Sequence, residues 1–400
     1  MNLPQPLVDL VARCTHLHIS TWAQWQALPP VTREQLGRFS YRERCVVPLA
    51  EVERIVATSG TSGRPPFLTA LGFTVRSYDF LDEWYRFSKP IVCVDQNYLR
   101  LEQYLARAGS PVPILIIDPR APKVTAALAQ AAGADTLFIL EPQLRSVGDE
   151  MARCGAAANI RFLMLGGGDI GPHVAYLSRT FPQAVLLGRY AASEVEGNPI
   201  GVPCNAVTPE APEQYYHANT DMHLDIVDPT DGTDVPWAPG AEGDLLVSTP
   251  HPAVASPLIR YKIGDRVRVA ETPCARHRAY AFAVLGRANL DFVKVQGGQL
   301  RVDELARTVR QFAAVITGEF ELQYTERDNG RGVELAATLY LEPRGPLDWT
   351  QFAETMAHEL RVGPSFTYAQ GVARGWYAPL VCAPLPPITQ GVKRKRLTRV

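Results

Sequence analysis

From residue 55 to residue 250, the chain alternates apolar runs with stretches of helical periodicity. The apolar runs resemble buried strands, and helical patterns such as KVTAALAQAAG at 123–133 lie between them. The runs are PVPILIID (111–118), ADTLFIL (134–140), IRFLMLGGG (160–168) and QAVLLGRY (183–190). Because strands that alternate with helices build a largely parallel sheet, this pattern predicts an α/β layered domain. Residues 1–50 are expected to form short helices and loops.

The pattern changes twice further along the chain. Residues 203–241 are polar and rich in proline. Strand-like runs return in EGDLLVST (242–249) and AYAFAVLGR (279–287). The composition shifts again after Gly286-Arg287, which predicts the start of a separate domain.

Three segments beyond this boundary have clear local signatures. Residues 302–312 place Val302, Leu305, Val309 and Phe312 on one helical face. Apolar and polar residues alternate through residues 320–343 on both sides of Asn329-Gly330, a strong turn signal, which predicts a β-hairpin. Asp348 is placed to cap the N-terminus of a later helix. The predicted organisation is therefore a large domain, residues 1–285, and a small α+β domain, residues 286–400.

Composition and charge narrow the functional classes. The 400 residues are 46% hydrophobic and 20% charged, and the formal net charge is −1, so no global field favours nucleic acid or an anionic membrane. The first residues lack the basic start and apolar core of a signal peptide, and no apolar run approaches the roughly 20 residues of a membrane span. Seven dispersed cysteines do not suggest a secreted disulfide framework. We therefore expect a cytoplasmic protein.

The stretch ATSGTSGRPP at residues 57–66 is the first candidate for chemistry. Glycine, serine, threonine and proline together are ordinary components of a surface loop. The same residues suit an anion site, since glycines let backbone N–H groups turn toward a phosphate and hydroxyls add donors. Composition alone leaves both interpretations open.

A second glycine-rich stretch follows the apolar run RFLML. Residues Gly166 to Gly171 match G-x-G-x-x-G, the dinucleotide-binding fingerprint. A dinucleotide domain normally begins with this loop and carries an acidic residue at the end of the next strand. Here the loop lies in mid-chain, and Glu194 lies beyond the next apolar run. An NAD-dependent oxidoreductase is therefore retained only as an alternative.

Five stretches, read in order, resemble motifs of the acyl-adenylate-forming (AMP-binding) superfamily, and in particular its phenylacetate–CoA ligase-like branch. ATSGTSGRPP resembles the phosphate loop, YAASE (190–194) the Y-G-x-[ST]-E motif, and PLIRYKIGD (257–265) the motif P-L-I-R-Y-x-T-G-D. VLGRANLDFVKVQGGQLRVDEL (284–305) resembles the crossover into the small domain, and GVKRKRL (391–397) the terminal G-K-x-x-R-V. The resemblance covers nearly the whole chain, and PLIRYKIGD is its most specific part.

The resemblance implies a ligase with a large N-terminal domain of layered sheets and helices and a small mobile α+β C-terminal domain. Such an enzyme uses ATP and Mg2+ to convert a carboxylic acid into an acyl-AMP, with release of pyrophosphate. The branch implies an aryl or arylacetic acid and transfer to a thiol, in the first place that of CoA. A carrier-protein thiol or an amine, as in secondary metabolism, is the alternative acceptor. The oligomeric state is not determined, and a homodimer is left open.

The resemblance also assigns roles to individual residues. The phosphate loop, residues 58–66, would hold the β- and γ-phosphates through Thr58, Ser59, Gly60, Thr61, Ser62, Gly63 and Arg64. The adenosine and acyl pocket would be lined by Gly167, Gly168, Asp169 and Phe73, with Tyr190 stacked on adenine and Ser193 in the same motif. The remaining roles are Mg2+ binding by Glu194, ribose binding by Asp265, ribose or phosphate binding by Arg287, and contact of Lys393 with the carboxylate and α-phosphate. For Asp169 alone, a helix N-cap is an equal alternative.

The chain departs from the family pattern at several positions. Ala191 replaces a glycine, Asn289 stands where the family has a hinge acid, and Lys395 lies close enough to Lys393 to rival it. These departures keep a third alternative, a non-catalytic relative that binds nucleotide. Some relatives also carry a structural zinc, for which the corresponding residues are Cys204, His217, Cys274 and His277. The second cysteine of the family's C-P-C-G run is missing, so a buried free cysteine and surface histidines are the alternative there.

Overall fold

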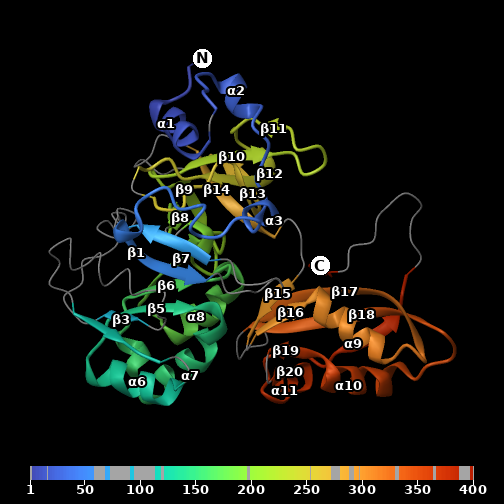
Figure 1. Ribbon diagram of the computed structural model, residues 1–400. Coiled ribbons are helices and arrows are strands. Elements are labelled where there is room, and N and C mark those ends of the chain that lie inside the picture. Colours follow the sequence, from blue (N-terminus) through green and yellow to red (C-terminus); the bar gives the residue numbers. More distant parts are fainter. Residues whose placement is uncertain are drawn as a thin grey trace.

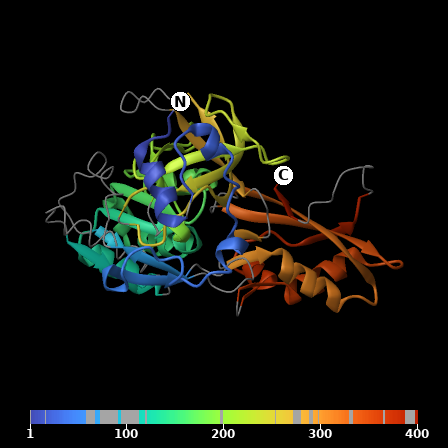
Figure 2. The same cartoon turned by 45° about the horizontal axis from the view of Figure 1, so that its top comes forward.

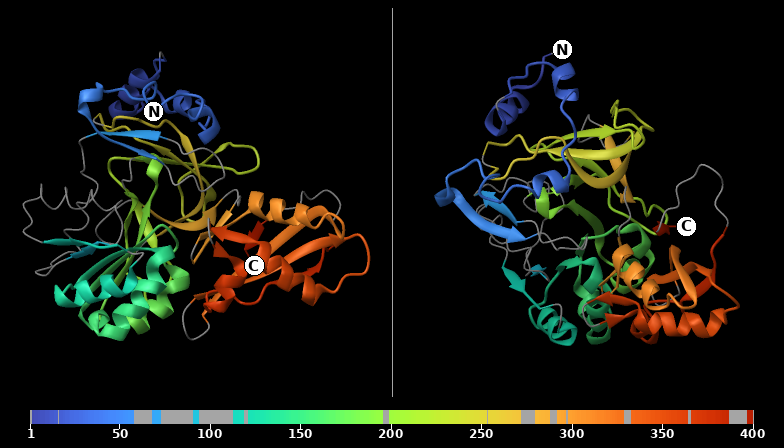
Figure 3. Two further views of the ribbon diagram at one scale, coloured as in Figure 1. Left: turned by 60° about the horizontal axis from the view of Figure 1, so that its bottom comes forward. Right: turned by 45° about the vertical axis from the view of Figure 1, so that its right-hand side comes forward.

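Figure 1 shows the computed structural model, in which the chain forms a larger and a smaller body side by side. The structure describes residues 2–15, 17–57, 68–72, 91–93, 113–118, 121–195, 199–252, 254–271, 280–287, 292–296, 298–328, 333–363, 366–386 and 397–399. The smaller body, drawn in orange and red, begins at residue 292, and two further views separate it from the larger one (Figure 3).

A mixed sheet of 12 strands forms the centre of the larger body, in the order β11-β10-β12-β13-β14-β9-β8-β7-β6-β5-β3-β4. Its parallel part contains β3 (Ile91–Cys93), β4 (Ile114–Ile116), β5 (Thr136–Leu140), β6 (Phe162–Gly166) and β7 (Val185–Ala191). Its antiparallel part contains β8 (Pro199–Pro203), β9 (Tyr215–Ala218), β10 (His223–Val227), β11 (Asp234–Val235), β12 (Glu242–Ser248), β13 (Tyr261–Ala270) and β14 (Ala281–Arg287). The parallel strands confirm the alternation predicted from the sequence.

Helices pack on the parallel strands and enclose an apolar core. These are α6 (Pro122–Ala131), α7 (Leu144–Cys154) and α8 (Val174–Thr180), with one-turn segments η3 (Glu141–Gln143), η4 (Ala156–Asn159) and η5 (Gly171–His173) between elements. Leu137, Leu163 and Met151 are fully buried in this core. The continuous apolar runs of β5 and β6 follow from burial on both faces, which is typical of parallel sheets.

The polar, proline-rich stretch 203–241 contains three strands, β9, β10 and β11. These strands are two to five residues long, too short for an apolar run to stand out from the surrounding polar residues. Ile226 and Val227 of β10 are nevertheless almost completely buried, and Ile226 packs in an apolar core with Leu245 and Val247 of β12. Tertiary pairing, which local composition does not report, decides the structure of this stretch.

The N-terminal segment lies over the antiparallel part of the sheet (Figure 2). It contains α1 (Gln5–Cys14), α2 (Trp22–Gln26), α3 (Arg33–Leu36), the turn η1 (Leu49–Glu51) and a hairpin of β1 (Val52–Ala57) and β2 (Leu68–Gly72). Trp25 is fully buried, and its indole N–H donates to Asp225 Oδ2 at 3.1 Å. This bond ties α2 to β10, so the short helices predicted for residues 1–50 are present and anchored.

The smaller body has its own apolar core and its own sheet, in the order β21-β18-β17-β22. Its elements are β15 (Phe292–Val295), β16 (Gly298–Arg301), α9 (Val302–Gln311), β17 (Ile316–Asp328), β18 (Val333–Pro343), α10 (Trp349–Glu359), β19 (Arg361–Gly363), β20 (Phe366–Thr367), α11 (Tyr368–Ala373), β21 (Val381–Pro384) and β22 (Leu397–Arg399). The predicted helix at 302–312 and the predicted hairpin are confirmed by α9 and by β17 and β18. Asp348 caps α10 as predicted, because its Oδ1 accepts from the N–H groups of Thr350 and Gln351.

No helix in the part of the chain that the structure describes is long and apolar enough to cross a membrane.

Candidate functional site

The carboxyl ends of β5, β6 and β7 lie next to one another at one edge of the sheet. Leu140 pairs with Gly166, and Gly166 pairs with Arg189. The residues that follow, Glu141 after β5 and Gly167 after β6, therefore lie near the end of β7. The carboxyl edge of a parallel sheet is where open α/β folds bind their ligands.

Tyr190 and Asp265, predicted from separate motifs, are joined by a hydrogen bond. The Tyr190 hydroxyl donates to Asp265 Oδ2 at 2.8 Å, and Asp265 is only 8% exposed. Asp265 lies on β13, where its backbone partner on β14 is Arg287. The structure thus brings together three predicted site residues from positions 190, 265 and 287.

An aromatic cluster fixes the ring of Tyr190. Its ring centroid lies 5.6 Å from that of Tyr216 and 5.9 Å from that of Phe282. Burial, and secondarily the nearby Asp169 carboxylate, raises the pKa of Tyr216, so this phenol stays protonated. A Cβ added at Gly188 would lie only 2.5 Å from the Tyr216 hydroxyl. The aromatic cluster therefore packs closely against the backbone of β7.

The glycine-rich turn after β6 has the conformation that its residues suggest. Gly167 has φ of 83°, a left-handed value that favours glycine. The Asp169 carboxylate accepts from the Gly171 N–H at 3.0 Å and so closes the turn that leads into η5. The helix N-cap alternative for Asp169 is wrong, because Ile170 is the N-cap of η5 and no side chain caps that turn. The predicted contact of Asp169 with a nucleotide stays a prediction.

Glu194 lies in η6 (Ser193–Val195), directly after β7. Its Oε1 is 3.8 Å from Nη1 of Arg33, and its side chain is 15% exposed. A partly buried carboxylate with a distant cation is chemically suited to a hard divalent ion such as Mg2+. That role, and the place of Ser193 in the nucleotide motif, stay predictions.

Several predicted residues lie outside the described part of the chain. These are the whole phosphate loop from Thr58 to Pro66, Phe73, the hinge position Asn289, and Lys393 with its rival Lys395. Ala57 pairs with Leu68, so the two described ends that flank the phosphate loop are neighbours in a hairpin.

Two of the predicted zinc ligands are described. His217 pairs with Val202, and the Cys204 N–H donates to the Tyr215 carbonyl at 2.8 Å. Because alternate residues of a strand share a face, Cys204 and His217 belong to the same face of the sheet. Cys274 and His277 lie outside the described residues, and within those residues no three His, Cys, Asp or Glu side chains form a metal-binding group. The zinc site stays a prediction.

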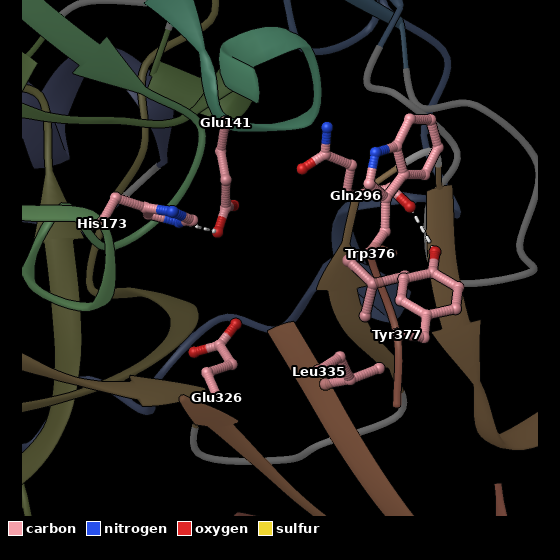
Figure 4. A pocket seen from close by; sticks show the side chains of 8 residues that line it. Glu141, His173, Gln296, Glu326, Leu335, Trp376 and Tyr377 are labelled. Atoms are coloured by element: carbon pink, nitrogen blue, oxygen red, sulfur yellow. Dashed lines mark hydrogen bonds and ion pairs between the residues drawn. The ribbon is translucent and has the colours of Figure 1, made fainter. Parts of the chain in front are cut away.

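Sequence reasoning missed two residues at this edge, Glu141 and His173. Nε2 of His173 and Oε1 of Glu141 are 3.1 Å apart, and both side chains are largely buried (Figure 4). A Cβ at Gly168 would overlap the Glu141 carboxylate, which therefore lies directly against the glycine-rich turn. The position of Glu141, the first residue after a predicted strand, was the one sequence feature that could have pointed to it.

Comparisons with known proteins bear on the fold. No family model matches the chain, and no curated protein sequence matches it. A solved 2-hydroxyisobutyryl-CoA ligase, in complex with 2-HIB-AMP and CoA, is 17% identical with a TM-score of 0.58, over 94% of this chain and 80% of that one. An o-succinylbenzoate CoA synthetase from Bacillus subtilis is 15% identical with a TM-score of 0.53, over 87% and 69% of the two chains. An amide bond synthetase from Marinactinospora thermotolerans is 15% identical with a TM-score of 0.51, over 87% and 68%.

These likenesses establish the fold of the chain as that of acyl-adenylate-forming enzymes. The predicted fold class is therefore confirmed. The strand β6 before the glycine-rich turn follows β3, β4 and β5, whereas a dinucleotide-binding domain normally opens with the strand and loop of its fingerprint. At this level of identity the comparisons carry no residue roles, which rest on the geometry above.

Proposed function

We propose that the protein activates a carboxylic acid by adenylation and then transfers the acyl group to a nucleophile. One observation carries the proposal. Tyr190 and Asp265 are hydrogen bonded beside the backbone of Arg287, at the carboxyl edge of a sheet with the adenylating fold. Each of these residues belongs to a different motif that resembles a nucleotide-binding motif, and the three lie more than 20 residues apart in the sequence.

The proposed chemistry replaces a poor leaving group with a good one. The carboxylate attacks the α-phosphate of ATP, which gives acyl-AMP and pyrophosphate, and AMP then leaves when a nucleophile attacks the acyl carbon. Tyr190 would stack on adenine, Asp265 would accept from the ribose hydroxyls, and Arg287 would contact ribose or phosphate. Positioning and charge neutralisation supply most of the rate enhancement in such phosphoryl chemistry.

The charged groups complete the proposed site. Glu194 would hold Mg2+ against the phosphates, and residues 58–66 would hold the β- and γ-phosphates. Lys393 would contact the carboxylate and the α-phosphate. The motif resemblance supports an aryl or arylacetic acid with Phe73 against its ring, and a structural zinc at Cys204, His217, Cys274 and His277 is a separate proposal.

The acceptor has two supported classes. The motifs of the phenylacetate–CoA ligase-like branch and the solved CoA ligases support a thiol, such as that of CoA or of a carrier protein. The solved amide bond synthetase supports an amine. The first half-reaction is common to both classes and can be tested without an acceptor.

The test is pyrophosphate release from Mg-ATP with a panel of aryl, arylacetic and fatty acids. We expect acid-dependent release by the unmodified protein. The variant Asp265→Asn should have a kcat/KM for ATP about tenfold or more below that of the unmodified protein. The reason is that an amide is a weaker acceptor than a carboxylate for the ribose hydroxyls. Asp231→Asn, at an exposed turn that contacts Thr233, is the matched control and should leave the rate unchanged. Equal rates for Asp265→Asn and the unmodified protein, or no release with any acid, would count against the proposal.

A further inference from the structure

Arg33, the first residue of α3, faces the carboxylate that is proposed to hold Mg2+. Its Nη1 lies 3.8 Å from Oε1 of Glu194, and the two side chains are 21% and 15% exposed. Arg33 belongs to none of the motifs discussed above. It precedes the phosphate loop in the sequence, whereas Glu194 follows β7, so the tertiary fold brings the two charges together.

The chain just before Arg33 is fixed to the strand that carries Asp265. The Val31 N–H donates to the Arg260 carbonyl at 2.9 Å, and the Val31 carbonyl accepts from the Lys262 N–H at 2.8 Å. Helix α3 then lies against β13 (Figure 1). The strand that positions the proposed ribose ligand therefore also positions Arg33.

Apolar packing fixes α3 relative to Glu194. Thr32 begins the helix with a capping box, and Leu36 lies one turn after Arg33. Leu36 packs against an apolar cluster that contains Val195, the residue after Glu194. The arginine and the carboxylate thus project from two elements that share one core.

The contact between the two charges is an ion pair that can rearrange easily. Charge-assisted N–H···O bonds span about 2.7–2.9 Å, which is well below the 3.8 Å of this pair. Ion pairs that keep some solvent contact also add little to the stability of a protein. Arg33 and Glu194 can therefore exchange their contact for stronger ones at little cost.

Mg-ATP offers a better partner to each of the two groups. Carboxylate oxygens suit the hard Mg2+ ion, and the planar fork of a guanidinium matches two phosphate oxygens. Because Mg2+ reaches the protein together with the triphosphate, a metal held by Glu194 brings phosphate oxygens to the carboxylate that Arg33 already faces.

We propose that Arg33 is a further ATP-binding residue, which contacts the β- or γ-phosphate in exchange for Glu194 when that carboxylate takes up Mg2+. The inference rests on the proposed function, since it adds a residue to the same nucleotide site. AMP has neither of these phosphates, so Arg33 distinguishes ATP from AMP. The guanidinium returns to Glu194 once pyrophosphate has left.

Nucleotide binding can be measured without acid or acceptor, by calorimetric titration of the full-length protein with Mg-ATP and with AMP. We expect Arg33→Ala to raise the Kd for Mg-ATP about tenfold to hundredfold, the range for a lost charge-assisted hydrogen bond. The Kd for AMP should stay unchanged, which also shows that the variant is folded. Arg38→Ala, at an exposed arginine just beyond α3, is the matched control and should bind both nucleotides normally. Equal losses for Mg-ATP and AMP, or unchanged binding of Mg-ATP, would overturn the proposal.

Metal-free ATP tests the exchange itself. Glu194→Gln removes the carboxylate that pairs with Arg33, so the guanidinium meets the phosphates without a competitor. In excess EDTA, we expect this variant to bind ATP several-fold more tightly than the unmodified protein does. The gain should disappear when Glu194→Gln is combined with Arg33→Ala. No gain, or an equal gain in the Arg33→Ala background, would show that no exchange takes place and would overturn the proposal.

The binding measurements separate this inference from the proposed function. Acid-dependent pyrophosphate release by the unmodified protein, with unchanged Mg-ATP binding by Arg33→Ala, would reject the inference alone. A selective loss of Mg-ATP binding in Arg33→Ala, with no pyrophosphate release by the unmodified protein, would support the inference and reject the proposed function.

Discussion

Arg260, in the middle of the PLIRYKIGD stretch, has a structural role that its motif does not reveal. It is 1% exposed and has φ of 44°, in the left-handed region that side chains rarely adopt. Its guanidinium reaches Asp234 Oδ1 at 2.6 Å and Asp225 Oδ2 at 3.4 Å. Asp225 also accepts from Trp25, so Arg260 holds β10, β11 and the N-terminal helices on one cluster of charges.

Removing this arginine should destabilise the protein strongly. Arg260→Ala leaves two largely buried carboxylates without their cation, and breaking a buried pair in this way costs about 3–5 kcal/mol. The free energy of unfolding, measured by urea titration with tryptophan fluorescence, should fall by that amount. Arg268→Ala is the control, because its pair with Glu213 is solvent exposed and should contribute no more than about 1 kcal/mol. Equal losses in the two variants would show that burial of the Arg260 pairs is not decisive.

At the level of single residues, the motifs name candidate site residues but not the contacts among them. Tyr190 and Asp265 come from separate motifs and are joined by a hydrogen bond, while their roles in nucleotide binding stay predictions. Glu141 and His173 belong to no motif, because their meeting depends on strand register and on the turn after β6. Such contacts are decided by tertiary structure, which a local pattern does not encode.

At the level of elements, helices and hairpins with a strong local sequence signal could be predicted, whereas short antiparallel strands could not. The hairpin of β17 and β18 was predictable because Asn329-Gly330 favours a tight turn, and α10 because Asp348 is a strong N-cap. β9 and β11 have no comparable signal, since each is too short for a period of two to be visible.

Helix α11 allows a test in which packing opposes helix propensity. Gly371 lies inside α11, where alanine would ordinarily be favoured by about 1 kcal/mol. A Cβ there would overlap the ring of Tyr377, which is 1% exposed and has little room to move. Overpacking of this kind costs about 1–3 kcal/mol, so Gly371→Ala should lower the midpoint of thermal unfolding. Gly345→Ala, which meets no atom within 4 Å, should leave the midpoint nearly unchanged. A midpoint raised by Gly371→Ala would mean that the Tyr377 ring is free to shift.

At the scale of the whole molecule, the fold could be predicted because several motifs occur in one order along the chain. The likeness to solved adenylating enzymes over 94% of the chain agrees with that order, although 17% identity leaves few residues in common. The acceptor could not be predicted in the same way.

The central claim is that a carboxylate attacks the α-phosphate of ATP, and an isotope measurement tests it most directly. The acid that supports pyrophosphate release would be supplied with both carboxylate oxygens labelled with 18O, together with Mg-ATP and a thiol or amine acceptor. Because the bridging oxygen leaves with the phosphate, mass spectrometry should find one labelled oxygen in the AMP that is released. Unlabelled AMP, or ADP and phosphate in place of AMP and pyrophosphate, would contradict the account.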